Sequence, residues 1–241
     1  MIKNFLTTAW RNLTKNKAYA TINVGGLALG MAVTLIIGLW VNNELGHNDY
    51  FSNKDKIAQV IQSQTFNNKV NTGPAIPRPL EFAFRENYMD NFEHLVMSSW
   101  TSSQYLTYNN NSISRTGNFM QRQAPEMLDL TIIAGSKDGL KDINSVMLSK
   151  KTAQALLGDE NPIGKLIEVN NEHKVMVTAI YEDIPFNTSF NDMQFIMSWE
   201  KYVTSQEWLE ESKDNWGNNS FQMFVTIADN TTKENVTSTI K

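Results

Sequence analysis

Cysteine is absent from this 241-residue sequence, and histidine occurs only three times. Without cysteine the chain can form neither a disulfide framework nor a thiolate metal site. The histidines, His47, His94 and His173, lie far apart and show none of the His-x-x-x-His or His-x-Glu spacings that are typical of zinc sites. The sequence therefore predicts no metal site.

Complete catalytic and nucleotide-binding motifs are also missing. Between Gly158 and Lys165 the glycine spacing is one residue too long for a phosphate loop, and Leu166 stands where that loop needs Ser or Thr. Ser149 is a plausible helix N-cap and Gly158 a plausible helix end, so we predict a short helix and a turn in this region. The string "GSKDG" from Gly135 has its serine one place too early for a hydrolase nucleophile. We expect no enzyme activity and no cofactor.

Acidic residues do not occur in the first 43 positions. Residues 1–17 contain four basic residues and no acidic one, whereas residues 44–241 contain 17 basic and all 25 acidic residues, a net charge of −8. Nucleic-acid binding needs clustered Lys and Arg to neutralise phosphates. The acidic main body therefore argues against nucleic acid as a partner.

An uncharged run of 24 residues, "AYATINVGGLALGMAVTLIIGLWV", extends from Ala18 to Val41. As a helix it would be about 36 Å long, which exceeds the hydrocarbon thickness of about 30 Å. It continues into "NNELGHND" and not into a small-x-small cleavage site, so we expect a retained membrane anchor and not a cleaved signal peptide. Basic residues before the run and acidic residues after it place the N-terminus in the cytoplasm and the residues after Leu45 outside.

Side chains suited to a membrane interface flank the run. Trp10 and Trp40 lie near its ends, as in an aromatic belt, and Arg11, Lys15 and Lys17 precede it. Apolar residues at helical spacing in the preceding segment predict an amphipathic helix in the inner membrane interface. In the alternative, the residues of this segment lengthen the membrane helix. We take Trp10, Arg11, Lys15, Lys17 and Trp40 as interfacial anchors.

A glycine pair, Gly26 and Gly30, lies inside the run and forms a G-x-x-x-G motif. Such a motif lets two helix backbones approach closely in a membrane. Glycine is frequent in membrane helices, so the motif fits a helix contact and an unpaired helix equally well. Both residues are candidates for helix–helix packing.

The region after the run alternates between strand-like and helix-like segments. Turn-like residues at 42–55 predict a stalk, "KIAQVIQSQ" predicts a strand, and "YLTYNNNSISRTGNFM" predicts a hairpin around Asn109–Ser112. Helices interspersed in a mixed sheet make an α+β domain. We divide the chain into an interfacial helix at 1–17, a transmembrane helix at 18–43 and an exported domain at 44–241.

Several segments in order resemble the MacB-like or FtsX-like permeases of ABC transporters, in the type common in Bacteroidetes. They are "AWRNLTKNKAYATINVGGLALGMA", "DKIAQV", "APEMLDLTIIAG", "SVMLSKKTAQALLGDENPIGKLIEV", "VTAIYEDIPFNTSFNDMQFIMSW" and "WGNNSFQMFVTI". The resemblance covers nearly the whole chain. It implies a mixed α/β periplasmic domain of two lobes, anchored in the bacterial inner membrane by one transmembrane helix.

The resemblance also implies partners and a function. It implies a permease dimer, made of two copies or two different chains, that transmits ATPase-driven motion to the periplasmic domain for export of a substrate. The ATPase is expected on a separate cytoplasmic chain, with or without a periplasmic adaptor and an outer-membrane channel. This sequence stops at Lys241, before the further membrane helices that the family implies. A single-pass anchored sensor or binding module is the alternative.

Overall fold

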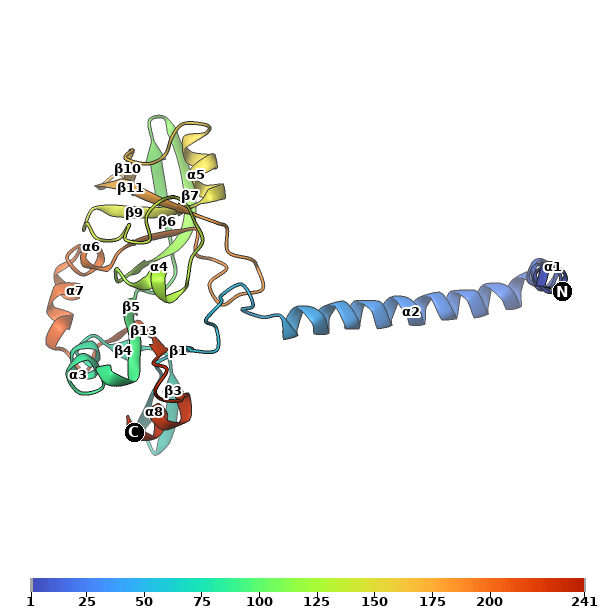
Figure 1. Cartoon of the computed structure of the whole chain (residues 1–241), viewed down its shortest axis with the longest axis horizontal. Helices are drawn as coiled ribbons and strands as arrows, with labels where there is room; N and C mark the ends of the chain where they lie inside the picture. The colour runs from blue at the N-terminus through green and yellow to red at the C-terminus, as the bar shows by residue number, and fades with distance from the viewer. Residues whose placement is uncertain (1, 241) are drawn as a thin grey trace. The chain divides into compact units, whose positions relative to one another are not determined.

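The computed structural model describes residues 2–240, with the side chains of Ile2 and Phe66 left out. The predicted interfacial helix begins at Met1 and the predicted exported domain ends at Lys241. Both of these residues lie outside the described residues. The chain divides into two compact units, one up to His47 and one from Asn48 onward, and each is described by itself. The predicted class, one apolar N-terminal helix followed by a mixed α/β domain, is confirmed (Figure 1).

The first unit consists of two helices, α1 (Ile2–Lys15) and α2 (Lys17–Leu45), which meet at Asn16. Asn16 leaves the helical region of the backbone, with φ −110° and ψ 62°, so the two helices are distinct. Helix α2 continues to Leu45, three residues beyond the start of the predicted stalk at position 42. The stalk prediction was wrong there because no proline or well-placed glycine stops the helix before Gly46.

The second unit is rich in strands. Its helical elements are α3 (Pro79–Asn87), η1 (Met89–Asn91), α4 (Ala124–Met127), α5 (Lys150–Leu157), α6 (Trp199–Val203), α7 (Glu207–Glu211), η2 (Ser212–Asp214) and α8 (Lys233–Thr239). Its strands are β1 (Ile57–Gln59), β2 (Gln62–Phe66), β3 (Lys69–Gly73), β4 (Ile76–Pro77), β5 (Phe92–Ser98), β6 (Ser102–Tyr108), β7 (Asn111–Met120), β8 (Ile132–Gly135), β9 (Ser145–Ser149), β10 (Leu166–Val169), β11 (His173–Tyr181), β12 (Phe195–Ser198) and β13 (Asn219–Ile227).

Eleven strands form one sheet in the order β1-β13-β5-β7-β12-β9-β11-β10-β6, with β4 paired to β13 and β8 to β11. Strand β6 also pairs with β7, so six strands from β7 to β6 form a closed circuit of pairings. Two pairings, β9 with β11 and β7 with β12, are parallel, and the others are antiparallel. The remaining two strands, β2 and β3, form a separate hairpin.

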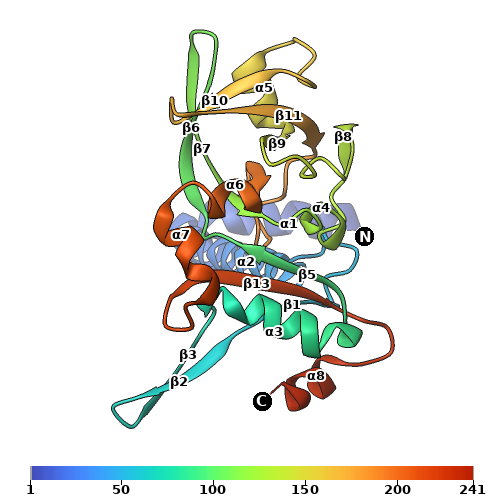
Figure 2. The same cartoon turned by 90° about the vertical axis from the view of Figure 1, so that its left-hand side faces the viewer.

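The two ends of this sheet form the two lobes of the domain. At one end β1, β13 and β5 pack with α3, α6 and α7 around a cluster that includes Leu95, Phe221 and Met223. At the other end the closed circuit packs with α5 around a cluster that includes Leu148 and Phe195. A third cluster contains residues of α4 and of β strands from both ends, so the lobes share apolar surface. Figure 2 shows the two ends joined at β5 and β7.

Several local predictions are confirmed. The Ser149 hydroxyl accepts a hydrogen bond from the Thr152 backbone N–H at 3.3 Å and begins α5, and Gly158 ends it with a φ of +65°. The hairpin turn between β6 and β7 lies at Asn109, whose φ is +53°. The predicted strand "KIAQVIQSQ" is interrupted: β1 stops after Gln59 and β2 starts in a different sheet.

Gly117 lies where β7 changes partners. It pairs with Ser102 on β6, and the next residue, Asn118, pairs with Ile196 on β12. A Cβ atom on Gly117 would lie 2.3 Å from the backbone oxygen of Phe195 and 2.7 Å from its ring. Only glycine fits, because strand backbones approach too closely for a side chain.

We therefore expect Gly117→Ala to lower the free energy of unfolding by about 1–3 kcal/mol, the usual cost of overpacking. Gly73→Ala is the matched control, since a Cβ atom there meets no atom within 4 Å. Its effect should stay within about 0.5 kcal/mol. Urea unfolding of both variants, followed by tryptophan fluorescence, measures the difference, and equal effects would contradict the packing argument.

Candidate functional site: the membrane anchor and its junction with the sheet

Helix α2 is the one helix among residues 2–240 that is long and apolar enough to cross a bilayer. Its side chains are not buried against protein, and its 29 residues correspond to about 43 Å of helix. Polar side chains within it bond to the helix itself: Asn23 donates to the Tyr19 carbonyl at 2.8 Å and Thr34 to the Gly30 carbonyl at 2.9 Å. These two bonds lower the cost of placing Asn23 and Thr34 in hydrocarbon.

The predicted interfacial anchors lie on both helices. Trp10, Arg11 and Lys15 are exposed on α1, Lys17 begins α2, and Trp40 is 63% exposed near the end of α2. Along α2, Lys17 and Trp40 are about 34 Å apart, close to the thickness of a hydrocarbon core. This spacing suits residues that anchor a helix at two interfaces.

Gly26 and Gly30 lie on one face of α2, four residues apart. A Cβ atom added to either glycine would meet no atom within 4 Å. Their surface is therefore open to another helix. The assignment of this face to helix–helix packing stays a prediction.

Residues 48–56, which we name the junction segment, are attached to the sheet domain by specific hydrogen bonds. Asn48 has a φ of +65°, its backbone N–H donates to the Asn187 carbonyl at 3.0 Å, and its amide oxygen accepts from the Ser189 N–H at 2.7 Å. The Asn53 side chain donates to the carbonyl of Met127, in α4, at 2.6 Å. The segment is therefore part of the domain and not a flexible stalk.

An ion pair and an aromatic contact add to this attachment. Ser52 donates to the Asp129 carboxylate at 2.7 Å, and Lys137 donates to the same carboxylate at 2.5 Å. The hydrogen bond from Lys137, followed by that from Ser52, lowers the pKa of Asp129. The stabilisation from this pairing is present above the ordinary Asp pKa and is lost as the pH falls through the lowered one. Phe51 is 3% exposed and meets Phe190 edge-to-face, with ring centroids 5.6 Å apart.

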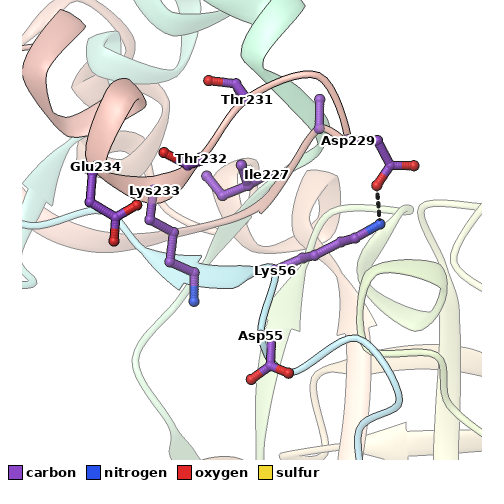
Figure 3. A pocket seen from close by; sticks show the side chains of 9 residues that line it. Asp55, Lys56, Ile227, Asp229, Thr231, Thr232, Lys233 and Glu234 are labelled. Carbon is purple, nitrogen blue, oxygen red and sulfur yellow. Dashed lines mark hydrogen bonds and ion pairs between the residues drawn. The ribbon is translucent and has the colours of Figure 1, made fainter.

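The junction segment leads directly into β1. Strand β1 pairs with β13, which is the last strand along the chain. The Ile227 N–H donates to the Lys56 carbonyl at 3.0 Å, and the Lys56 ammonium forms an ion pair with Asp229 (Figure 3). The hydrogen bond with Asp229 raises the pKa of Lys56. These residues, with Thr232 at the start of α8, line an open cavity of about 350 Å³. The start and the end of the domain are thus held together.

A second polar network joins the two lobes. Glu81, which is 6% exposed, accepts from Arg85 Nε at 3.0 Å and from the Gln121 amide at 2.5 Å. Arg85 also donates to the Leu95 carbonyl at 3.0 Å, and the Gln121 amide oxygen accepts from the Met97 N–H at 2.9 Å. Helix α3, strand β5 and the residue after β7 are therefore fixed to one another. The Glu81–Arg85 pair has the i,i+4 spacing of a helix. Periodicity could not have indicated Gln121, which lies 40 residues from Glu81 in sequence.

Comparison with known proteins places this arrangement in a family. Residues 20–241 match the family of MacB-like periplasmic core domains, a match that begins inside α2 and includes the whole sheet domain. The chain belongs to the MacB-like periplasmic core domain family. No curated protein sequence gives a significant match.

Solved structures share the fold of this MacB-like domain at low sequence identity. A domain of a proposed permease from Porphyromonas gingivalis has a TM-score of 0.63 and 18% identity, over 78% of this chain and 80% of that one. The periplasmic region of MacB from Actinobacillus actinomycetemcomitans has a TM-score of 0.57 and 12% identity, over 79% and 82%. The extracellular domain of the ABC-type transporter YknZ from Gram-positive bacteria has a TM-score of 0.50 and 18% identity, over 69% and 80%.

In this MacB-like domain the segment from Gly158 to Lys165 is a turn between α5 and β10. Lys165 donates to the Glu160 carboxylate at 2.5 Å, and its ammonium lies 5.6 Å from the centroid of the Tyr108 ring. The lysine that a phosphate would need is therefore already paired within the turn. Among the residues that the structure describes, no three His, Cys, Asp or Glu side chains cluster in a way that could hold a metal ion.

The aromatic attachment of the junction segment can be tested by truncation. Phe51→Ala should lower the free energy of unfolding by about 3–5 kcal/mol, the usual cost of removing a buried phenylalanine side chain. Tyr105→Ala, which removes an aromatic ring that is 64% exposed, is the control and should change it by no more than about 0.5 kcal/mol. Hydrogen exchange should accelerate most at residues 48–56 in the Phe51 variant. Unchanged exchange there would show that the ring does not hold the segment.

Proposed function

We propose that this chain supplies the first membrane helix and the periplasmic core domain of an ABC transporter permease. In this proposal the permease transmits ATPase-driven motion across the inner membrane to the periplasmic domain, for export or extrusion of a substrate. The chain itself hydrolyses no ATP and holds no cofactor, and a separate cytoplasmic ATPase supplies the motion. A second permease subunit, either another copy of this chain or a different chain, completes the transporter, with or without a periplasmic adaptor and an outer-membrane channel.

The observation that carries the proposal is the attachment of the junction segment. Gly46 and His47 are the only residues between the end of α2 and this segment. In this proposal a displacement of the helix reaches, through these two residues, a segment that is hydrogen-bonded to α4 and to the loop at Asn187–Ser189. A simple tether would need no such bonds, because a flexible chain keeps a domain near a membrane equally well.

The second support is the pairing of β1 with β13. A force that enters at Lys56 acts along β1, and the β1–β13 hydrogen bonds pass it to the central sheet. Folded sheets resist such a displacement as a unit because their interiors are close-packed. The family match supports a transporter over other anchored proteins.

A flexible insertion after Gly46 tests the proposal in the complete permease with its ATPase. Ten Gly/Ser residues have an end-to-end distance of about 17 Å and would absorb a displacement of several ångströms. ATP hydrolysis should continue, while substrate export should fall at least about tenfold. The same insertion between Asn109 and Asn110, at an exposed hairpin turn, is the control and should leave export unchanged. Normal export with the Gly46 insertion would favour the anchored sensor or binding module.

The proposed orientation can be tested by labelling, because the chain has no native cysteine. Thr14→Cys on α1 and Ser112→Cys on β7 each introduce one exposed thiol. An impermeant thiol reagent, applied to cells with a permeabilised outer membrane, should label position 112 and leave position 14 unlabelled until the inner membrane is opened. The reverse pattern would place the sheet domain in the cytoplasm and overturn the proposal.

A further inference from the structure

The β2–β3 hairpin is attached to the domain at its base, and the side chains described beyond the base are exposed. The Gln62 amide donates to the Ala75 carbonyl at 2.6 Å and to the Asn219 side chain at 2.7 Å, which fixes the base beside β13. Beyond this base both strands are exposed, and Val70 is 67% exposed. Figure 2 shows the hairpin extending away from the main sheet. A two-stranded hairpin is only marginally stable in water, so this one has an incomplete sheet.

The register of the hairpin determines which backbone groups face outward. Asn67 and Asn68, with φ of +49° and +59°, form the two-residue turn, and Phe66 opposite Lys69 is the pair that flanks it. The pair flanking a two-residue turn is hydrogen-bonded, and the pattern alternates along the strands. The N–H and C=O groups of Ser63 and Thr65 therefore point outward along the free edge of β2. Those of Val70 and Thr72 point outward along the edge of β3.

The two edges differ in protection against pairing with another strand. Proteins block free edges with charged residues, proline or bulges. Strand β2, "QSQTF", contains none of these, whereas β3 begins with Lys69. The β2 edge is therefore the one that is open to strand addition.

We propose that the β2 edge pairs antiparallel with the β2 edge of a second copy of this chain, which joins two hairpins into one four-stranded sheet. The inference rests on the proposed function in the form in which both permease subunits are copies of this chain. In an arrangement centred on Gln64, Ser63 lies opposite the partner subunit's Thr65, and Thr65 opposite the partner subunit's Ser63. The outward groups of each strand then bond to those of the other, giving a symmetric interface.

The charge distribution favours a second copy at this place. Residues 44–241 carry a net charge of −8, so two copies repel each other over most of their surfaces. No acidic residue occurs between Ile57 and Leu80. In the antiparallel pairing the bases of the two hairpins lie at opposite ends of the paired strands. A five-residue strand is about 17 Å long, roughly two Debye lengths at physiological salt, so the pairing keeps the two acidic sheet domains apart. Anchoring in one membrane raises the effective concentration of the two edges, which a small interface needs.

Disulfide cross-linking of the full-length chain in its native membrane tests this pairing. Gln64→Cys places two cysteines opposite each other in a non-hydrogen-bonded pair, where Cα atoms are about 4.5 Å apart, within the range that a disulfide requires. Asn71→Cys, on β3 opposite Gln64, is the control, because three strand spacings put its two copies about 14 Å apart. Mild oxidation should give a covalent dimer with Gln64→Cys at a rate at least about tenfold above Asn71→Cys.

A second pair of variants shows whether backbone pairing brings the cysteines together. Thr65→Pro, added to Gln64→Cys, removes an outward N–H and should reduce cross-linking at least about fivefold. Thr72→Pro, which changes the β3 edge, should leave the rate unchanged. Equal rates for Gln64→Cys and Asn71→Cys, faster linking at Asn71, or a disulfide to a different protein would each overturn the inference.

Native mass spectrometry of the wild-type complex separates this inference from the proposed function. If the complex contains two permease copies and Gln64→Cys does not cross-link, only the β2 pairing is wrong. If the complex contains one copy and no ATPase, the proposed transporter function is wrong as well. A dimer that cross-links rapidly at Gln64 and slowly with Thr65→Pro supports both.

Discussion

Strands β1 and β13 pair antiparallel, with Ile57 opposite Thr226, although they belong to the start and the end of the domain. The pairing joins two segments that are separated by almost the entire domain in sequence. Bringing them together has an entropic cost, which the contacts formed between them and within the domain must offset. The Lys56 carbonyl and the Ile227 N–H extend the pairing to the junction segment. The segments that begin and end the sheet domain are therefore held side by side.

The same constraint explains why the two lobes form a single compact unit. Strand β7 leaves the closed circuit and pairs with β5 through Met120 opposite Ser98, while Gly117 lets β12 approach its backbone. Immediately after this strand, Gln121 bonds to both Glu81 and Met97. Hydrogen bonds and close packing cross the boundary between the lobes. These contacts support the proposal that the domain passes on a displacement as a whole, because two loosely joined lobes would absorb part of it.

Three charged side chains of the domain take part in structural contacts. Arg85, Asp129 and Lys165 are each paired with neighbours that fix turns, lobes or the junction segment. In the exposed β2–β3 hairpin, by contrast, the outward backbone groups have no partner strand in the sheet described here.

The sequence alone determined the features that depend on local patterns. The uncharged run predicted the apolar helix, Ser149 and Gly158 predicted the limits of α5, and the residues around Asn109–Ser112 predicted the hairpin of β6 and β7. The resemblance of ordered segments predicted the family, which the match over residues 20–241 confirms. These features could be predicted because capping, turn and hydrophobic preferences act between residues that are close in sequence.

Only the tertiary structure decided which strands pair and what the junction segment does. The parallel pairings of β9 with β11 and β7 with β12 join segments separated by other elements, and no periodicity encodes a partner. Residues 42–55 have a turn-like composition, so local reasoning predicted a stalk, and the junction segment at 48–56 lies mostly within it. The attachment of this segment depends on Asn187, Met127 and Phe190, which are distant in sequence. The physical reason is that burial and hydrogen bonding between distant segments override local preference once the chain is compact.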